Sequence, residues 1–278
     1  MKSEIVISGD YSYEFSGSWS NHPIGTAHFH PFYEIYFLLN GEVSYLIEND
    51  RYDISEGYFV CIPPNTYHNV LRKQRVDRKR VVMYFSEKAM NDFFSAIPNL
   101  SRCFENRVIL TREYKNNIFD SFNLLVEEKD FSKNNPAMIK ALLTQILVMM
   151  ERECISNGKI SSFQNNDILS KHILEMSEYI NEHYSEDISL NSLSKMFYLN
   201  PSYISRSFKM VHGLSFSEYR NMIRLQQAAK LLATTKLSLS EIANECGFKT
   251  ANGFSSVFKS HTGFSPTAYK KRIIDSDK

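Results

Sequence analysis

Four side chains near the N-terminus, three imidazoles and one carboxylate, are of the types that hold metals or polar ligands. His28, His30 and Glu34 lie within one short segment, and His68 follows further along the chain. Imidazole and carboxylate groups coordinate divalent transition metals, and they also hydrogen-bond to small polar molecules. Two aromatic side chains that could line the same pocket are Tyr36 and Tyr45.

A second set of polar side chains repeats near the C-terminus and has the types that contact DNA. The segment 205–209 (Ser-Arg-Ser-Phe-Lys) recurs fifty positions later as 255–259 (Ser-Ser-Val-Phe-Lys). Such self-similarity indicates two copies of one structural unit. Further pairs are Gly213 with Gly263, Ser215 with Ser265, and Tyr219 with Tyr269.

Each copy is predicted to be a short helix, a turn and a second helix. The helices are expected at Leu190–Phe197 and Pro201–Met210, and again at Leu239–Cys246 and Thr250–Ser260. One face of each second helix is apolar, and the opposite face is polar and basic. The apolar residues are Ile204, Phe208 and Val211 in the first copy and Phe254, Val257 and Phe258 in the second. The outer faces carry Ser202, Ser205, Arg206 and Lys209, then Asn252, Ser255, Ser256 and Lys259.

Between the copies, apolar residues at helical spacing predict one helix at Phe216–Ala233. At 1.5 Å per residue it would be about 27 Å long. A rod of that length can hold two recognition helices about 34 Å apart, as two successive major grooves of DNA require. A repeated helical bundle for protein contacts has the same core pattern, but it does not explain why polar, basic faces recur in register.

This C-terminal region resembles the AraC/XylS family of transcription regulators over about Lys171–Arg272. The resemblance is carried by Glu241–Phe248 (Glu-Ile-Ala-Asn-Glu-Cys-Gly-Phe), Phe254, Phe258-Lys259, 262–266 (Thr-Gly-Phe-Ser-Pro) and Tyr269. It implies that bases are read by Ser202, Ser205 and Arg206 in the first unit and by Asn252, Ser255 and Ser256 in the second. Lys209 and Lys259 are expected to contact phosphates. Ser256 stands where arginine is frequent and Gly253 where an aromatic residue is usual, so we expect looser reading by the second helix.

The N-terminal half is predicted to be a small antiparallel barrel. Tyr33–Glu48 is typical of two strands joined by a tight turn at Asn40-Gly41, a hairpin signal. Further strands are expected at Tyr52–Ile54, Tyr58–Ile62 and Arg80–Phe85. Helices are expected at Asn116–Glu127 and Pro136–Glu153; they could make a dimer or cover one face of the barrel.

Residues 25–85 of this half resemble the cupin family. Gly25, His28, His30, Glu34 and Gly41 fit its first motif, and Gly57, Pro63, Asn65 and His68 fit its second, with Asn65 where glycine is usual. In metal-binding cupins the equivalents of His28, His30, Glu34 and His68 hold a divalent transition metal. AraC/XylS regulators commonly use such a barrel as a sensor, so an effector pocket is favoured over a metal site, and no cofactor is predicted. The residues expected to line this pocket are His28, His30, Glu34, Tyr36, Tyr45 and His68.

Length and charge are consistent with two modules. In this α+β chain of 278 residues we expect an effector-binding and dimerisation domain at 1–155, a linker at 156–170 and a DNA-binding domain at 171–278. Segment 188–273 carries 12 Lys and Arg against 3 acids, net +9, whereas the rest carries 20 against 28, net −8. A basic module beside an acidic one suits a chain in which one domain alone binds phosphate.

The remaining features point to the cytoplasm. The four cysteines are widely spaced, as expected of reduced thiols, and no apolar stretch has the length of a signal peptide or membrane span.

The sequence therefore predicts an effector-responsive transcription activator, not an enzyme. Its expected partners are double-stranded DNA, a small-molecule effector such as a sugar, a second copy of the chain and RNA polymerase. A metal-dependent cupin enzyme fused to a DNA-binding domain is the alternative, and an effector-independent architectural DNA binder is a third possibility.

Overall fold

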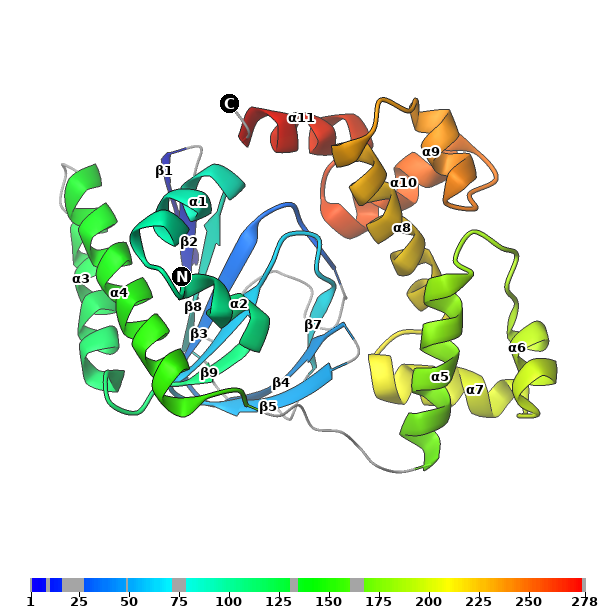
Figure 1. Cartoon of the computed structure of the whole chain (residues 1–278), viewed down its shortest axis with the longest axis horizontal. Coiled ribbons are helices and arrows are strands. Elements are labelled where there is room, and N and C mark those ends of the chain that lie inside the picture. The colour runs from blue at the N-terminus through cyan, green and yellow to red at the C-terminus, as the bar shows by residue number, and fades with distance from the viewer. Residues whose placement is uncertain are drawn as a thin grey trace.

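The chain folds into an N-terminal part with two β-sheets and a C-terminal part made of helices (Figure 1). The computed structural model describes residues 2–8, 11–16, 28–48, 50–71, 79–130, 135–160 and 168–276. Across these residues, no helix combines the length and apolarity needed to cross a membrane.

Every strand pair in the two sheets is antiparallel. The larger sheet has the order β1 (Lys2–Ser8), β2 (Tyr11–Ser16), β8 (Lys79–Phe85), β3 (Tyr33–Asn40), β6 (Tyr58–Ile62) and β9 (Val108–Leu110). The smaller sheet has the order β5 (Asp50–Ser55), β4 (Glu42–Ile47) and β7 (His68–Leu71). The described strands thus confirm the antiparallel sheets, but within the described residues they do not close into the small barrel that the sequence predicted.

The turn at Asn40-Gly41 exists, but the predicted hairpin was wrong. Gly41 has φ +97°, a conformation open to glycine, and strands β3 and β4 flank it as expected. However, β3 pairs with β8 and β6, so both of its edges are used, whereas β4 pairs with β5 and β7. The turn therefore carries the chain from one sheet to the other.

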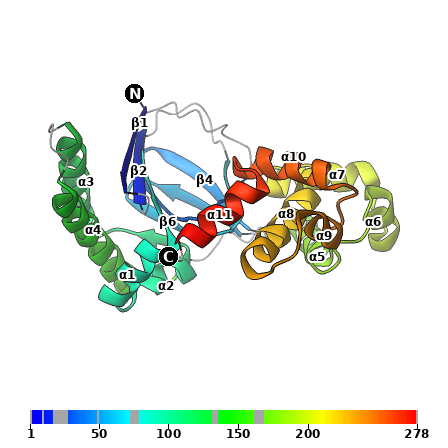
Figure 2. The same ribbon diagram turned by 90° about the horizontal axis from the view of Figure 1, so that it is seen from above.

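Four helices of the described chain follow strand β8, with β9 between the second and the third: α1 (Glu87–Ala96), α2 (Leu100–Asn106), α3 (Lys115–Asp130) and α4 (Pro136–Asn157). The two longer ones confirm the predicted helices. Ile139, Ile146 and Leu147 of α4 share one buried cluster with Ile35 and Phe37 of β3, so α4 covers a sheet face. Helices α3 and α4 lie on the side of the sheets away from the C-terminal helices (Figure 2). Helix α4 runs into the predicted linker, of which residues 161–167 lie outside the described part of the chain.

The C-terminal helices confirm both predicted helix-turn-helix units to within two residues at each end. The turns are fixed by local caps: the Asn200 side chain accepts a hydrogen bond from Ser202 N (2.8 Å), and Ser215 and Ser238 form capping boxes with Glu218 and Glu241. The helices are α5 (Ile168–Glu182), α6 (Leu190–Phe197), α7 (Pro201–His212), α8 (Phe216–Thr234), α9 (Leu239–Glu245), α10 (Ala251–Thr262) and α11 (Pro266–Ser276).

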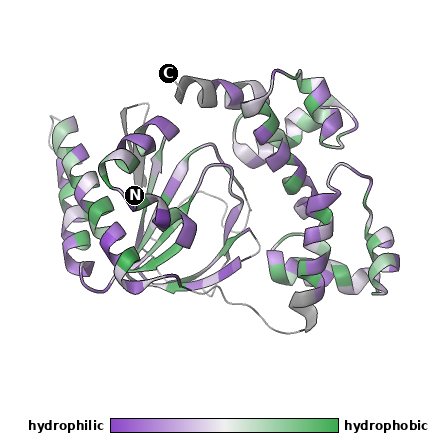
Figure 3. Ribbon diagram, viewed as in Figure 1, coloured by the Kyte–Doolittle hydropathy of each residue, from purple (hydrophilic) through white to green (hydrophobic). Residues whose placement is uncertain are grey.

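Each unit has its own apolar core, and the long helix α8 contributes to both. Its first half, including Tyr219, packs with Ile204 and Phe208 of α7. Its second half, including Leu225, packs with Phe258 of α10. Figure 3 shows hydrophobic and hydrophilic residues together on these helices, as amphipathic helices require.

A buried arginine on α8 ties the two units together. Arg224 is 6% exposed; its Nε and Nη2 donate to the carbonyl oxygens of Tyr184 and Glu186, each at 2.7 Å, and its Nη1 donates to that of Gly247 at 2.8 Å. The first two acceptors precede α6, and the third lies in the turn before α10. Charge-assisted bonds to carbonyls from both units fix their relative position.

We expect Gly247→Ala to destabilise the protein more than Gly263→Ala. Both glycines have positive φ, but an added Cβ at Gly247 would lie 2.4 Å from the Ser185 carbonyl oxygen, whereas one at Gly263 would meet nothing within 4 Å. Gly263→Ala should cost about 1 to 2 kcal/mol, the left-handed backbone penalty, and Gly247→Ala about 3 kcal/mol or more. Urea unfolding of the full-length variants measures both, and equal losses would contradict the expected clash.

Acid should destabilise the first unit through His212. This side chain is fully buried, its Nε2 lies 2.9 Å from Ser177 Oγ, and burial lowers its pKa from 6.5 to about 3. The unfolded chain therefore binds the proton more tightly, so the stabilising contribution is complete above about pH 6.5 and is lost as the pH falls toward 3. Between pH 7 and pH 5, protonation of this group in the unfolded chain should lower the free energy of unfolding of the wild type by about 2 kcal/mol.

Urea unfolding at several pH values tests this, with His212→Gln as the comparison. The variant should show a shallower loss of stability between pH 7 and pH 5. The same pH slope in both proteins would mean that His212 does not titrate on unfolding as argued.

Candidate effector site and nucleic-acid interface

Four titratable side chains converge in the N-terminal part, and we call them the histidine-glutamate cluster: His28, His30, Glu34 and His68. One potential ligand atom from each lies within 4.8 Å of the others. The Nε2 atoms of His30 and His68 lie 2.9 and 3.3 Å from the same oxygen, Glu34 Oε2. His28 is half-buried and the other three are buried. The structure thus brings together the four residues singled out from the sequence.

Backbone pairing positions this cluster. Glu34 lies on β3 of the larger sheet, and His68 opens β7 of the smaller one. His28 and His68 form an isolated antiparallel bridge, in which each amide nitrogen lies 3.1 Å from the other's carbonyl oxygen. The cluster therefore draws residues from both sheets.

Hydrogen bonds to the backbone orient two of the imidazole rings. His30 Nδ1 lies 3.0 Å from the Phe32 carbonyl oxygen, and His68 Nδ1 lies 2.9 Å from that of Thr66. A carbonyl oxygen only accepts, so each Nδ1 carries a hydrogen and each Nε2 is turned toward Glu34. With Nδ1 already donating to a carbonyl, a ring that is also protonated on Nε2 donates to Glu34 Oε2, as the 2.9 Å distance from His30 requires. A ring without that proton would offer its Nε2 lone pair to a bound metal.

The cluster keeps a negative charge at its centre. Burial alone would raise the pKa of the Glu34 carboxyl, but the imidazoles of His68 and His30 outweigh it and hold that pKa well below the usual range. Burial lowers the pKa of His30, against the opposing effect of Glu34. A buried carboxylate among imidazoles can accept hydrogen bonds from hydroxyl groups or bind a cation.

Both predicted tyrosines lie beside the cluster. The Tyr45 hydroxyl donates to Glu34 Oε1 at 3.1 Å, and burial and then Glu34 raise the pKa of that hydroxyl well above its usual value. The Tyr45 ring lies 5.3 Å from that of Tyr36 and is stacked with that of His68 at 6.3 Å, centroid to centroid. All six residues predicted to line the effector pocket therefore meet in one place. Gly25, the first position of the first cupin motif, lies outside the described residues.

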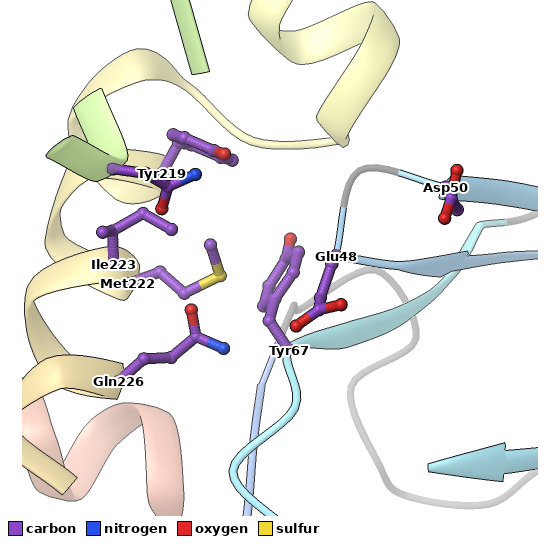
Figure 4. Close-up of a pocket in the computed structure, with 8 residues that line it drawn as sticks. Glu48, Asp50, Tyr67, Tyr219, Met222, Ile223 and Gln226 are labelled. Carbon is purple, nitrogen blue, oxygen red and sulfur yellow. The ribbon is translucent and has the colours of Figure 1, made fainter. Parts of the chain in front are cut away.

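A cavity that the sequence did not predict lies between the N-terminal sheets and the helices (Figure 4). Its volume is about 280 Å³. Its walls come from segments far apart in the chain, so no local pattern could reveal it. The lining residues are Glu48, Asp50, Tyr67, Asn181, Tyr219, Met222, Ile223 and Gln226.

The polar faces of α7 and α10 are open to solvent, and Figure 2 shows both helices on the same side of α8. Of the eight residues predicted to contact DNA, Ser205 and Ser255 are half-buried and the other six are exposed: Ser202, Arg206, Lys209, Asn252, Ser256 and Lys259. The apolar residues of the same helices, such as Phe208 and Phe258, are fully buried. Each helix thus presents short polar and basic side chains on a rigid support, as a major-groove reader requires.

Arg206 lies on this open face without an acidic partner among the described ion pairs. Its Nε donates to the Ser202 carbonyl oxygen of its own helix at 3.3 Å. Glu218 instead accepts from Ser215 N at 2.8 Å as a helix cap. The guanidinium of Arg206 is therefore available for an external acceptor.

Comparisons with known proteins assign each half of the chain. Residues 18–147 match the family model of the AraC-like ligand binding domain, and residues 193–272 match that of a helix-turn-helix domain. The chain is 22% identical over 265 residues to the melibiose operon regulatory protein of Escherichia coli K12, covering 90% of this chain and 85% of that protein. It is 35% identical over 95 residues to the HTH-type transcriptional regulator YijO of the same organism.

The match to YijO spans only 34% of the length of either chain. The solved C-terminal domain of AraT, a response regulator from Geobacillus stearothermophilus, is 36% identical, with a TM-score of 0.36. That match covers 38% of this chain and 88% of the solved domain.

Proposed function

The chain belongs to the AraC family of transcription regulators, and we propose that it binds specific DNA sites with α7 and α10 in response to a small molecule held at the histidine-glutamate cluster. The observation that supports this most strongly is the repeated unit. Twice, a helix with an apolar side packed into a core presents polar and basic residues to solvent.

The two recognition helices would divide the contacts between bases and phosphates. Ser202, Ser205 and Arg206 of α7 would face base edges in one major groove, and Asn252, Ser255 and Ser256 of α10 would face them in the next. Lys209 and Lys259 lie about one turn further along each helix, and we assign them to phosphates. With 19 residues, α8 is about 28 Å long, so it can hold the two helices near one DNA turn apart.

The effector would be a small polar molecule, for which a sugar is our first candidate. The carboxylate of Glu34 and the imidazoles accept hydrogen bonds from hydroxyl groups, and the rings of Tyr36 and Tyr45 offer apolar faces. Because the chain is similar to a melibiose operon regulatory protein, melibiose and its component sugars should be tested first. A rise in melting temperature with one sugar, absent in Glu34→Ala, would identify the effector class.

We further propose that the regulator is an activator that contacts RNA polymerase and acts in the cytoplasm as a homodimer. The outer sides of α3 and α4 expose Leu124, Met138 and Ile155, each about half accessible, although the inner side of α4 is used by the sheets. A dimer would bury these three side chains. Sedimentation of the wild type beside Leu124→Glu tests this, since the charge should favour the monomer.

A second candidate is supported by the same cluster. Three imidazoles and one carboxylate, with two Nε2 atoms directed at the centre, suit a divalent transition metal such as zinc or iron. His28, His30, Glu34 and His68 would hold the ion, which would polarise a bound substrate oxygen. Stoichiometric iron with oxygen consumption in the purified protein would support a cupin-type enzyme fused to a DNA-binding domain, and its absence would favour the effector site.

The proposed function is tested by mapping the DNA sites bound by the full-length chain in its host. We expect a limited set of promoter-proximal sites whose occupancy changes when the effector is supplied. Genes beside these sites would also indicate the effector. Binding spread evenly over the chromosome would instead favour an architectural DNA binder.

A further inference from the structure

The smaller sheet has one face toward the histidine-glutamate cluster and the other toward the C-terminal helices. Successive side chains of a strand point to opposite faces. Tyr45 donates its hydrogen bond to Glu34, while the next residue, Leu46, lies in the apolar core of the first helix-turn-helix unit. His68 belongs to the cluster, while Tyr67 lies in that same apolar core. The smaller sheet therefore contacts the ligand site with one face and the DNA-binding domain with the other.

The segment that carries His28 and His30 alternates in the same way. Phe29, between them, is 1% exposed and belongs to the apolar core of the second unit. Its ring meets those of Phe258 and Tyr269 edge to face, with centroids 6.2 and 6.4 Å away. Phe258 lies on the buried side of α10. The residue between two cluster histidines thus touches the second recognition helix directly.

Asn65 makes a second link to the same unit. Its amide N donates to the His30 carbonyl oxygen at 2.8 Å, and its own carbonyl oxygen accepts from Gln226 Nε2 at 3.0 Å. Its side-chain Oδ1 accepts from the hydroxyl of Tyr269 on α11. Asn65 has φ +60°, a left-handed conformation that asparagine adopts more readily than most residues other than glycine, so the turn holds its side chain toward Tyr269 without unusual strain.

Contact with the first unit is less complete. Leu46 and Tyr67 share the apolar core of that unit, but the cavity of about 280 Å³ lies between Tyr67 and helix α8 (Figure 4). The Tyr67 hydroxyl is buried and has no hydrogen-bond partner among the described residues. The N-terminal part therefore packs more closely against the second helix-turn-helix unit, which contains α10, than against the first unit, which contains α7.

We propose that Phe29 and Asn65 are positioning residues that transmit the state of the histidine-glutamate cluster to α10. This inference rests on the proposed function, because it names how that site regulates DNA binding. A ligand that rearranges His28, His30 or His68 must move the backbone of the two segments that hold Phe29 and Asn65. The result is a change in how firmly α10 is packed against Phe29 and its own core, which changes how the second major groove is read.

Hydrogen-deuterium exchange of the full-length chain tests the proposal without a ligand. Phe29→Ala and Asn65→Gly should each raise the exchange rate of 251–262 in α10 about tenfold, while 201–212 in α7 changes little. The matched control is Leu46→Ala, which removes a contact with the first unit and should leave α10 unchanged. Phe29→Leu, which keeps an apolar side chain, should restore most of the protection.

A pocket substitution then tests transmission. Glu34→Gln should change α10 exchange in the wild-type background and have no further effect in the Phe29→Ala background. In binding-site selection, the sequences chosen by Asn65→Gly should lose their base preference in the half-site bound by α10 and keep it in the half-site bound by α7.

Unchanged α10 exchange in both Phe29→Ala and Asn65→Gly, or equal changes in α7 and α10, would overturn the proposal. An additive effect of Glu34→Gln and Phe29→Ala would also overturn it. Failure of the wild type to select any DNA sequence would count against the proposed function instead, and the exchange results would still decide whether the cluster and α10 are coupled.

Discussion

Replacing Arg206 by alanine should weaken operator binding about 10- to 100-fold and relax the preference at one base pair. Arginine can donate two hydrogen bonds to O6 and N7 of guanine, a contact worth about 1 to 3 kcal/mol against a wrong base. The structure leaves Arg206 exposed, with one bond to the Ser202 carbonyl of its own helix. Ser256→Ala, at the corresponding place on α10, should cost under about 1 kcal/mol, a typical neutral hydrogen bond.

Lys209→Ala is the control for a charge effect. It removes a cation from the same helix and should weaken binding to all DNA sequences. The slope of the logarithm of the binding constant against the logarithm of the salt concentration should become shallower by about 1. Binding-site selection with wild type, Arg206→Ala and Lys209→Ala separates the two roles. If wild type and Arg206→Ala select the same sequence at every position, Arg206 does not read bases. The prediction that α7 discriminates bases more tightly than α10 would then be wrong.

The double variant His30→Ala/Glu34→Ala should lose the effector response entirely while it still binds operator DNA. It removes the shared oxygen and one of the two imidazoles that meet at it. It touches neither α7 nor α10, whose polar faces lie on the other domain. The measurement is a promoter reporter with and without effector, beside a mobility shift without effector.

Lys115→Ala serves as the matched control for this variant. Lys115 pairs with Glu56 at 2.9 Å on the surface of the same domain, with both side chains substantially exposed. Its loss should leave the effector response intact. A folded His30→Ala/Glu34→Ala protein that no longer binds the operator would show that the cluster supports the DNA-binding domain rather than sensing a ligand.

The C-terminal helices could be predicted closely because their signals are local. An amphipathic period marks each helix, and Asn200-Pro201 and the Ser-x-x-Glu capping boxes mark the starts. Helices α1 and α2 were missed, although α1 has local signals: Ser86 caps it by accepting from Ala89 N, and Ala89, Met90 and Phe93 form its buried side. Strand β7 was missed because its pairing with β4 is not visible in the local sequence.

Strand pairing depends on distant segments and was the weakest prediction. The strands were placed correctly around Asn40-Gly41, but nothing local shows that β8 and β6 occupy both edges of β3. The same limit applies to the candidate site. Motif spacing brought His28, His30, Glu34 and His68 together correctly, whereas the contacts of Phe29 and Asn65 with the second unit join residues about 160 to 240 positions apart.

Arg224 shows a further limit of sequence reasoning. A single arginine in an otherwise apolar helix face has no period or motif to mark it, yet it binds three carbonyl groups from both units. Its role follows only from the tertiary structure. The signal that could have found it is an arginine on the side of α8 where Tyr219, Met222 and Leu225 predict a buried stripe.

We propose that α7 and α10 of one chain read two successive major grooves. Selection of bound sequences from a random DNA library by the full-length protein decides whether they do. We expect a two-part motif with centres about 10 base pairs apart, one turn of DNA, and with stronger preference in the half bound by α7. A single short motif, or no enrichment over the starting library, would contradict it.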